Sequence, residues 1–135
     1  MNYGTDTHEE LHEVNDSIAE EMRPVDVQDR MTAAYIEATG GVETIRVGDL
    51  PVPEPGPTEV LVRMEASEVN HVDLFVRSGA FPTPMPFPFV IGRDLVGTVV
   101  AVGEAVEAFS PGDRVWSNSL GHGGRQGTFA EYVTA

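Results

Sequence analysis

The sequence predicts a mainly β domain, built as a barrel or a sandwich of short strands. Segments of alternating apolar and polar residues, rich in Val, Ile, Thr and aromatic side chains, recur along the chain. Gly and Pro interrupt these segments about every ten residues, a spacing typical of all-β folds. The chain has 135 residues, enough for one hydrophobic core, and contains no internal repeat. We therefore expect one domain over residues 31–135, preceded by an extension over residues 1–30.

The extension differs from the rest of the chain in composition, because it holds nine acidic residues against two Arg. Thr7 and Glu10 match a capping box, which is a common helix start, and Pro24 ends the pattern. Four apolar residues between them lie on one helical stripe: Leu11, Val14, Ile18 and Met22. The pattern predicts a short acidic amphipathic helix over about residues 8–22.

The elements of the domain can be placed in order along the chain. We expect strands at residues 34–37, 43–47, 59–69, 91–103, 114–116 and 127–134. The Pro-rich stretches 51–57 and 81–89 are predicted to be loops, because proline lacks the N–H that a strand ladder needs. A helical turn is expected over residues 70–79, begun by Asn70 and ended by Gly79.

The composition excludes several classes of function. The formal net charge is −14 and all eight basic residues are Arg. A surface with this much negative charge repels nucleic acid and anionic membranes. High acidity without any Lys favours a halophilic protein from a salt-rich cytoplasm over an acidic protein from an ordinary cytoplasm. The chain has no Cys, which excludes disulfides and thiolate metal sites. Since it shows neither a signal segment nor an apolar run of about 18 residues, we expect a cytoplasmic protein.

A charged pair, Arg93 and Asp94, opens the longest apolar run of the sequence. A charge at the start of a buried strand must be solvated, paired or functional, and a structural ion pair and a functional role both remain open. Asn70 is expected to cap the helical turn, and Asp73 to bond backbone donors in the same turn. These residues alone indicate no more than a β-rich domain with a polar rim.

Five motifs follow one another in a familiar order between residues 51 and 133. They lie at residues 51–57 leading into 59–63, at 70–79, at 92–97 with 102–103, at 111–115 and at 127–133. Each motif is weak alone, but together they resemble the N-terminal GroES-like domain of medium-chain dehydrogenases/reductases. This family contains zinc alcohol dehydrogenases and zinc-free quinone reductases. The resemblance implies a partly open GroES-like β-barrel with short helical turns.

The resemblance also bears on metal binding. The zinc branch of the family binds its catalytic metal with a Cys at the position of Asn70 and a His at that of Arg93, and an acid at Asp94 completes the site. Only the acid is present here, since a guanidinium cannot be a ligand and Asn is a poor one for zinc. The four-Cys structural zinc lobe is replaced by the short segment 117–126. The chain is thus similar to the zinc-free quinone reductases, and no metal site is expected.

In those relatives the Asn position and a nearby Tyr line the substrate pocket beside the nicotinamide. Asn70 matches the Asn, whereas Phe75 stands at the Tyr position and lacks the hydroxyl that could donate a proton. Arg93 is not the residue expected in this branch, and it either pairs with Asp94 or binds an anionic group of the substrate. The resemblance therefore implies Asn70, Phe75, Arg93 and Asp94 as pocket-lining or orienting catalytic residues.

The activity that the resemblance implies is hydride transfer from NADPH or NADH to a quinone or an activated double bond. Asn70 would orient the carbonyl, and an apolar wall would come from Phe75, the second Pro-rich loop and Trp116, although Trp116 is more simply expected in the core. No Gly-rich phosphate loop of a Rossmann domain occurs in these residues. Tight dinucleotide binding and turnover are therefore expected only with a nucleotide-binding domain.

Two other interpretations stay open at this point. The first is a stand-alone, non-catalytic module that uses an exposed apolar face, and the acidic helix, to bind a partner protein or itself as a homo-oligomer. The second is a gene remnant without function. A defined oligomer that needs no cofactor would favour the module, and poor solubility would favour the remnant.

Overall fold

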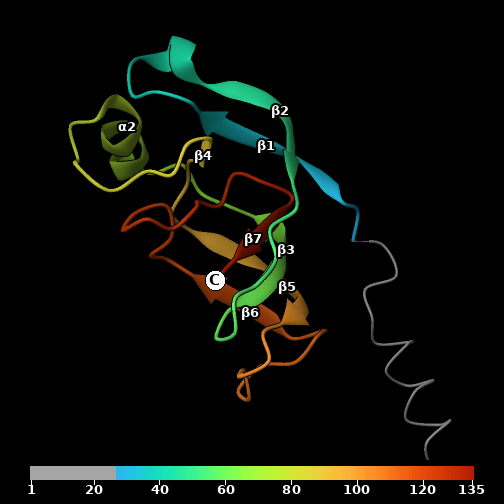
Figure 1. Ribbon diagram of the computed structural model, residues 1–135. Helices are drawn as coiled ribbons and strands as arrows, with labels where there is room; N and C mark the ends of the chain where they lie inside the picture. Colours follow the sequence, from blue (N-terminus) through green and yellow to red (C-terminus); the bar gives the residue numbers. More distant parts are fainter. Residues whose placement is uncertain (1–26) are drawn as a thin grey trace, which may run out of the picture.

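The computed structural model describes residues 27–135, and the helix expected over residues 8–22 lies outside the described residues. Figure 1 shows the elements of the described part in space. The strands are β1 (Arg30–Ile36), β2 (Arg46–Pro51), β3 (Val60–Ala66), β4 (Phe89–Val90), β5 (Leu95–Val102), β6 (Arg114–Ser117) and β7 (Tyr132–Thr134). The helices are the short 3-10 helix η1 (Val42–Thr44) and the α-helix α2 (His71–Ser78). Neither helix has the length or the apolar character needed to cross a bilayer, and none other lies within residues 27–135.

The strands form two antiparallel sheets, with the orders β2-β1-β4 and β6-β5-β3-β7. In Figure 1 the smaller sheet lies above the larger one, with α2 beside its β4 end. A bridge between Ala33 and Ala130 joins the two sheets, and the backbone N–H of Ala34 donates to the carbonyl of Phe129 over 2.8 Å. Contact at this seam, without a continuous ladder, makes the partly open β-barrel that the resemblance implied.

The core consists of three apolar clusters, which arise because alternate residues of each strand point to opposite faces of a sheet. One cluster contains Met31, Ala33, Leu61, Val90, Val100, Ala130 and Tyr132. A second contains Val60, Val62, Leu95, Val99, Leu120 and Val133. In the third, Val76 of α2 packs against Ile36, Phe89 and Ile91. This third cluster fixes α2 to the smaller sheet and thereby holds the N-terminus of the helix in place.

The strand predicted over residues 43–47 is wrong in position. Val42–Thr44 forms η1, and β2 begins only at Arg46 and continues to Pro51, inside a stretch that was predicted to be a loop. Pro51 pairs with Arg30. The sheet tolerates this proline because β2 is an edge strand and Pro51 is its last residue.

Two other predicted strands, at residues 91–103 and 127–134, are shorter at their starts than expected. β5 begins at Leu95 and β7 at Tyr132. The loop before β5 packs against the loop before β7. The backbone N–H of Gly127 donates to the carbonyl of Val90 over 2.8 Å, and that of Thr128 donates to the carbonyl of Gly92 over 3.2 Å. Gly92 has a φ of +115°, which favours glycine and interrupts the strand.

Trp116 is not in the core, contrary to the simplest expectation from the sequence. Its side chain is 73% exposed. β6 is an edge strand whose alternate residues Val115 and Ser117 are half-buried, so Trp116 lies on the outward face of the strand. A single exposed apolar side chain is common on protein surfaces, so the exposure of Trp116 does not by itself indicate a site.

Candidate functional site

The candidate site lies where the N-terminus of α2 meets the loop before β5. Asn70 is the N-cap residue of α2, as predicted, and Gly79 ends the helix with a φ of +85°. The carboxylate of Asp73 accepts a hydrogen bond of 2.7 Å from the backbone N–H of Asn70. This bond occurs in capping boxes, and it fixes the main chain of Asn70.

A second carboxylate fixes the side chain of Asn70. Its Nδ2 donates to Oδ2 of Asp94 over 2.6 Å, a charge-assisted bond worth about 1.5–3 kcal/mol. Only the amide nitrogen can donate to a carboxylate, so this bond determines which way the Asn70 amide points. The residues at 70 and 94, which are 24 positions apart in sequence, therefore form one unit.

Two hydroxyl groups, one bonded to the other, support the backbone of Asp94. Ser67 Oγ donates to the backbone carbonyl of Asp94 over 2.6 Å and lies 2.8 Å from Thr128 Oγ1. Because the Ser67 hydrogen is used on Asp94, Thr128 must donate to Ser67. Thr128 is fully buried, so this chain of bonds anchors the site in the core. Sequence reasoning missed both hydroxyls, and only the spatial contact between the two loops identifies them.

Arg93 does not form the structural ion pair with Asp94 that the sequence left open. It takes part in none of the ion pairs found among residues 27–135. Its guanidinium carbon lies 5.9 Å from the ring centroid of Phe81, within the range of a cation–π contact. The Nη2 atom is buried and has no hydrogen-bond partner. Arg93 is thus a cation near the Asn70–Asp94 unit that forms no ion pair with any carboxylate in the described part.

The charges of the site influence one another. Burial raises the pKa of Asp73 above its ordinary value of 3.8, and the nearby Asp94 carboxylate raises it further. The hydrogen bond from Asn70 and the charge of Arg93 act in the opposite direction and lower this pKa. Asp94 and Arg93 therefore both lie within electrostatic reach of Asp73, in a partly dry environment where such effects are strong.

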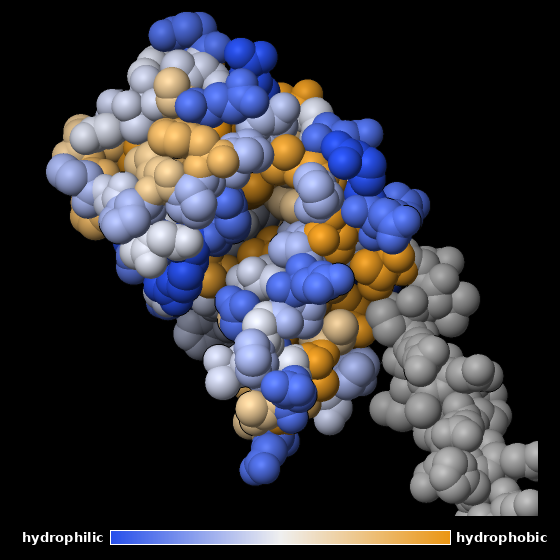
Figure 2. Space-filling view, in the orientation of Figure 1, coloured by the Kyte–Doolittle hydropathy of each residue, from blue (hydrophilic) through white to orange (hydrophobic). Residues whose placement is uncertain are grey.

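Aromatic side chains flank this polar cluster. Phe75 on α2 is 54% exposed, and Phe81 in the second Pro-rich loop is 41% exposed. Figure 2 shows apolar residues at the surface in the region that α2 occupies in Figure 1. A hollow of about 400 Å³ is lined in part by Asp94, Trp116 and Ser67. The structure thus unites Asn70, Arg93 and Asp94, and it leaves Phe75 on the exposed surface of the helix.

The residues at this place do not fit a zinc ion. Arg93 offers no lone pair, and the Asn70 amide uses its nitrogen on Asp94. Within residues 27–135 no cluster of three or more His, Asp or Glu side chains has the arrangement of a metal site. The donor set therefore supports hydrogen bonding and electrostatic stabilisation.

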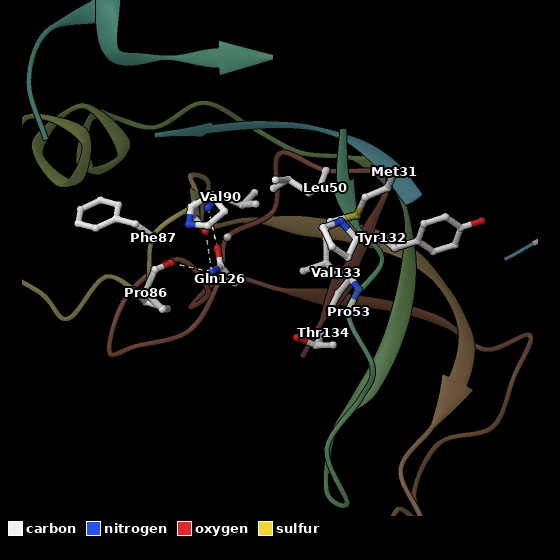
Figure 3. Close-up of a pocket in the computed structure, with 14 residues that line it drawn as sticks. Met31, Leu50, Pro53, Pro86, Phe87, Val90, Gln126, Tyr132, Val133 and Thr134 are labelled. Atoms are coloured by element: carbon white, nitrogen blue, oxygen red, sulfur yellow. Dashed lines mark hydrogen bonds between the residues drawn. The ribbon is translucent and has the colours of Figure 1, made fainter. Parts of the chain in front are cut away.

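A separate apolar pocket of about 350 Å³ opens near the seam between the sheets (Figure 3). Met31, Leu50, Pro53, Phe87 and Tyr132 are among the residues that line it. Gln126, at its edge, uses its side chain internally: Oε1 accepts from Val90 N–H, and Nε2 donates to the carbonyls of Pro86 and Pro88. Sequence patterns did not predict this pocket, because its lining comes from strands and loops far apart in the chain.

Comparisons with known proteins agree with this architecture. Residues 56–135 match the family model described as the alcohol dehydrogenase GroES-like domain. The quinone oxidoreductase of Lama guanicoe is 39% identical over 106 residues, covering 78% of this chain and 31% of the relative. The chain therefore spans about a third of the length of such curated relatives.

Solved structures give the same result. A mycobacterial quinone oxidoreductase is 43% identical with a TM-score of 0.67, covering 78% of this chain and 31% of the other. A mycobacterial protein complexed with NADPH is 44% identical with a TM-score of 0.66, covering 78% of this chain and 30% of the other. The chain belongs to the alcohol dehydrogenase GroES-like domain family of the medium-chain dehydrogenases/reductases, and its named relatives include quinone oxidoreductases.

Proposed function

We propose that this domain forms one wall of the substrate site of a zinc-independent, NAD(P)H-dependent oxidoreductase that reduces quinones or activated alkenes. Turnover requires a nucleotide-binding domain, because the sequence contains no Gly-rich phosphate loop between a strand and a helix. The observation that carries the proposal is the 2.6 Å hydrogen bond from Asn70 to Asp94, at the positions where zinc relatives hold metal ligands. A rigid hydrogen-bond donor replaces the Lewis acid there.

The geometry of Asn70 defines its role in this proposal. Its Nδ2 carries two hydrogens, and Asp94 accepts one of them. The second N–H remains to bind a substrate carbonyl oxygen. Because Asp73 holds the backbone and Asp94 holds the amide, this donor is pre-organised before substrate arrives. Asn70 therefore orients the carbonyl, while NAD(P)H supplies the hydride.

The aromatic residues have a separate role. Exposed Phe75 and Phe81 offer apolar surface for a planar substrate, and burial of such rings adds binding energy without charge. Phe75 cannot donate a proton, so the proton that completes the reduction must come from water or from another part of the protein. The chain's own contribution is then binding, orientation and exclusion of water.

A fusion protein tests the proposal. The chain is joined after Ala135 to the nucleotide-binding part of the 43% identical mycobacterial enzyme, and NADPH oxidation by a small quinone is followed with and without molar KCl. We expect turnover from the fusion and none from the chain alone. Asn70→Ala should lower kcat/KM about 10²-fold, as is typical for loss of one pre-organised donor.

Ser119→Ala is the matched control, because its side chain is exposed and its carbonyl alone is bonded, to Arg125. It should keep the activity of the unmodified fusion. A folded fusion that binds NADPH but does not reduce quinones or enones would refute the proposal. In that case a defined oligomer of the chain alone would support the interpretation as a protein-binding module.

A further inference from the structure

The proposed orientation of the carbonyl by Asn70 leaves the guanidinium of Arg93 without an assigned role. Arg93 has a buried Nη2 with no hydrogen-bond partner and no ion-pair partner among residues 27–135. A buried donor without an acceptor is costly, and a native structure that keeps one calls for an explanation such as a missing ligand. The carboxylate next in sequence, Asp94, is committed to Asn70. The structure thus keeps a guanidinium without an ion pair, and with one nitrogen unbonded, near the proposed carbonyl site.

We propose that Arg93 is a catalytic residue that stabilises the oxyanion formed when hydride adds to the substrate, an inference that rests on the proposed reductase function. Hydride from the dihydronicotinamide forms a new C–H bond on the quinone or enone. The displaced π electron pair moves onto the carbonyl oxygen and gives an enolate, which for a quinone is the keto tautomer of the hydroquinone monoanion. The cofactor is oxidised in the same step, and water later protonates the oxygen.

The net negative charge of the chain favours a neutral substrate, which becomes an anion only at Arg93, over a substrate that is already an anion in solution. The chain carries a net charge of −14, which repels preformed anions in solution. A neutral quinone approaches without this penalty and becomes negative only beside Arg93. An interaction that strengthens in the transition state raises kcat, whereas one that is equally strong in the ground state does not.

The surroundings of Arg93 suit this role. The guanidinium carbon lies over the Phe81 ring, 5.9 Å from its centroid, within the range of a cation–π contact. Neither Phe75 nor Phe81 has a hydroxyl, so no phenol at these two positions can neutralise the oxygen. Arg93 lies within electrostatic reach of Asp73 but forms no ion pair with it, and the hydrogen bonds of Asp73 and Asp94 go to Asn70. Arg93 is therefore the cation at this site that can stabilise a new negative charge on the oxygen that Asn70 binds.

A binding experiment on the whole 135-residue chain tests this without any dinucleotide. Pentafluorophenolate, which is ionised at neutral pH, mimics the oxyanion, and pentafluorobenzyl alcohol is its neutral counterpart. Both are titrated in molar KCl and followed by ¹⁹F NMR, because salt screens the distant charges while a partly buried pair is screened less. We expect the chain to bind the phenolate about tenfold more tightly than the alcohol.

Arg93→Met should reduce this preference to less than about twofold and leave the weak binding of the alcohol unchanged. Arg63→Met is the control, because Arg63 is exposed on β3 and lies outside the site, and it should keep the full preference. Arg93→Lys retains the charge and should keep part of the preference, which preserves the test if the Met variant does not fold. In the fusion protein, Arg93→Met should lower kcat more than it raises KM.

Three results would overturn the inference: no binding of the phenolate, equal binding of both probes, or a preference that survives Arg93→Met in a folded protein. These results would leave the reductase proposal intact, because that proposal depends on NADPH-driven turnover of the fusion. Conversely, an inactive fusion with an intact Arg93-dependent preference would refute the reductase and identify an anion site.

Discussion

Replacing Gly92 by Ala should destabilise the domain through a specific steric clash. Gly92 has a φ of +115°, and a Cβ added there would lie 2.3 Å from Thr128 Oγ1 and 2.9 Å from the ring of Phe129. Thr128 is fully buried and bonded to Ser67, so it cannot move aside at low cost. The left-handed backbone costs about 1–2 kcal/mol and the overpacking about 1–3 kcal/mol more. We therefore expect Gly92→Ala to lower the free energy of unfolding by about 2–5 kcal/mol.

Gly112 provides the matched control. Its φ is +96°, but an added Cβ would meet nothing within 4 Å. Gly112→Ala therefore carries the backbone cost alone, about 1–2 kcal/mol. The difference between the two variants isolates the contact between the loop before β5 and the loop before β7. That contact holds Arg93 and Asp94 in place, so the same measurement reports on the support of the site.

Urea unfolding followed by circular dichroism in molar KCl is the suitable assay. Fluorescence is a poorer probe of this transition, since the single Trp is already exposed in the folded state. Adding Thr128→Ala to Gly92→Ala should recover part of the loss, because the two sites share one contact. Equal destabilisation by Gly92→Ala and Gly112→Ala would refute the argument that the loop packing is tight.

Three further predictions concern the same domain. Burial raises the pKa of Asp73, so the folded state keeps the carboxyl proton to a higher pH than the unfolded chain does. The contribution of Asp73 to stability therefore falls as the pH rises above 3.8. Asp73→Asn should therefore match the wild type in urea midpoint at low pH and exceed it at neutral pH; a variant that becomes relatively weaker as pH rises would contradict this. Trp116→Ala should change the free energy of unfolding by less than about 0.5 kcal/mol, and Trp116 emission should be quenched by acrylamide, whereas protection from the quencher would show a covered side chain. The net charge of −14 predicts a higher urea midpoint in molar KCl than in dilute buffer, and a midpoint independent of salt would count against a halophilic protein.

Local patterns in the sequence predicted the helix of the site correctly. Asn70 and Gly79 are residues whose chemistry suits helix ends, and α2 lies between them. The run from Leu95 to Val102 was recognised as a strand because β-branched residues recur along it. The two Arg93 alternatives, an ion pair or a functional role, could not be decided locally, since neighbours in sequence need not face one another.

The sequence by itself determined the β-rich class and the capped helix, because propensity, capping and periodicity act over a few residues, whereas the candidate site residues came from the order of motifs that resembles a known family. Only the tertiary structure decided that Asp94 bonds Asn70, that Ser67 and Thr128 support Asp94, and that Arg93 stays unpaired over Phe81. It also decided that Trp116 faces outward, since the exposure of a strand residue depends on which face of the sheet is covered. These features depend on the contact of segments up to 61 residues apart, and no local pattern encodes such a contact.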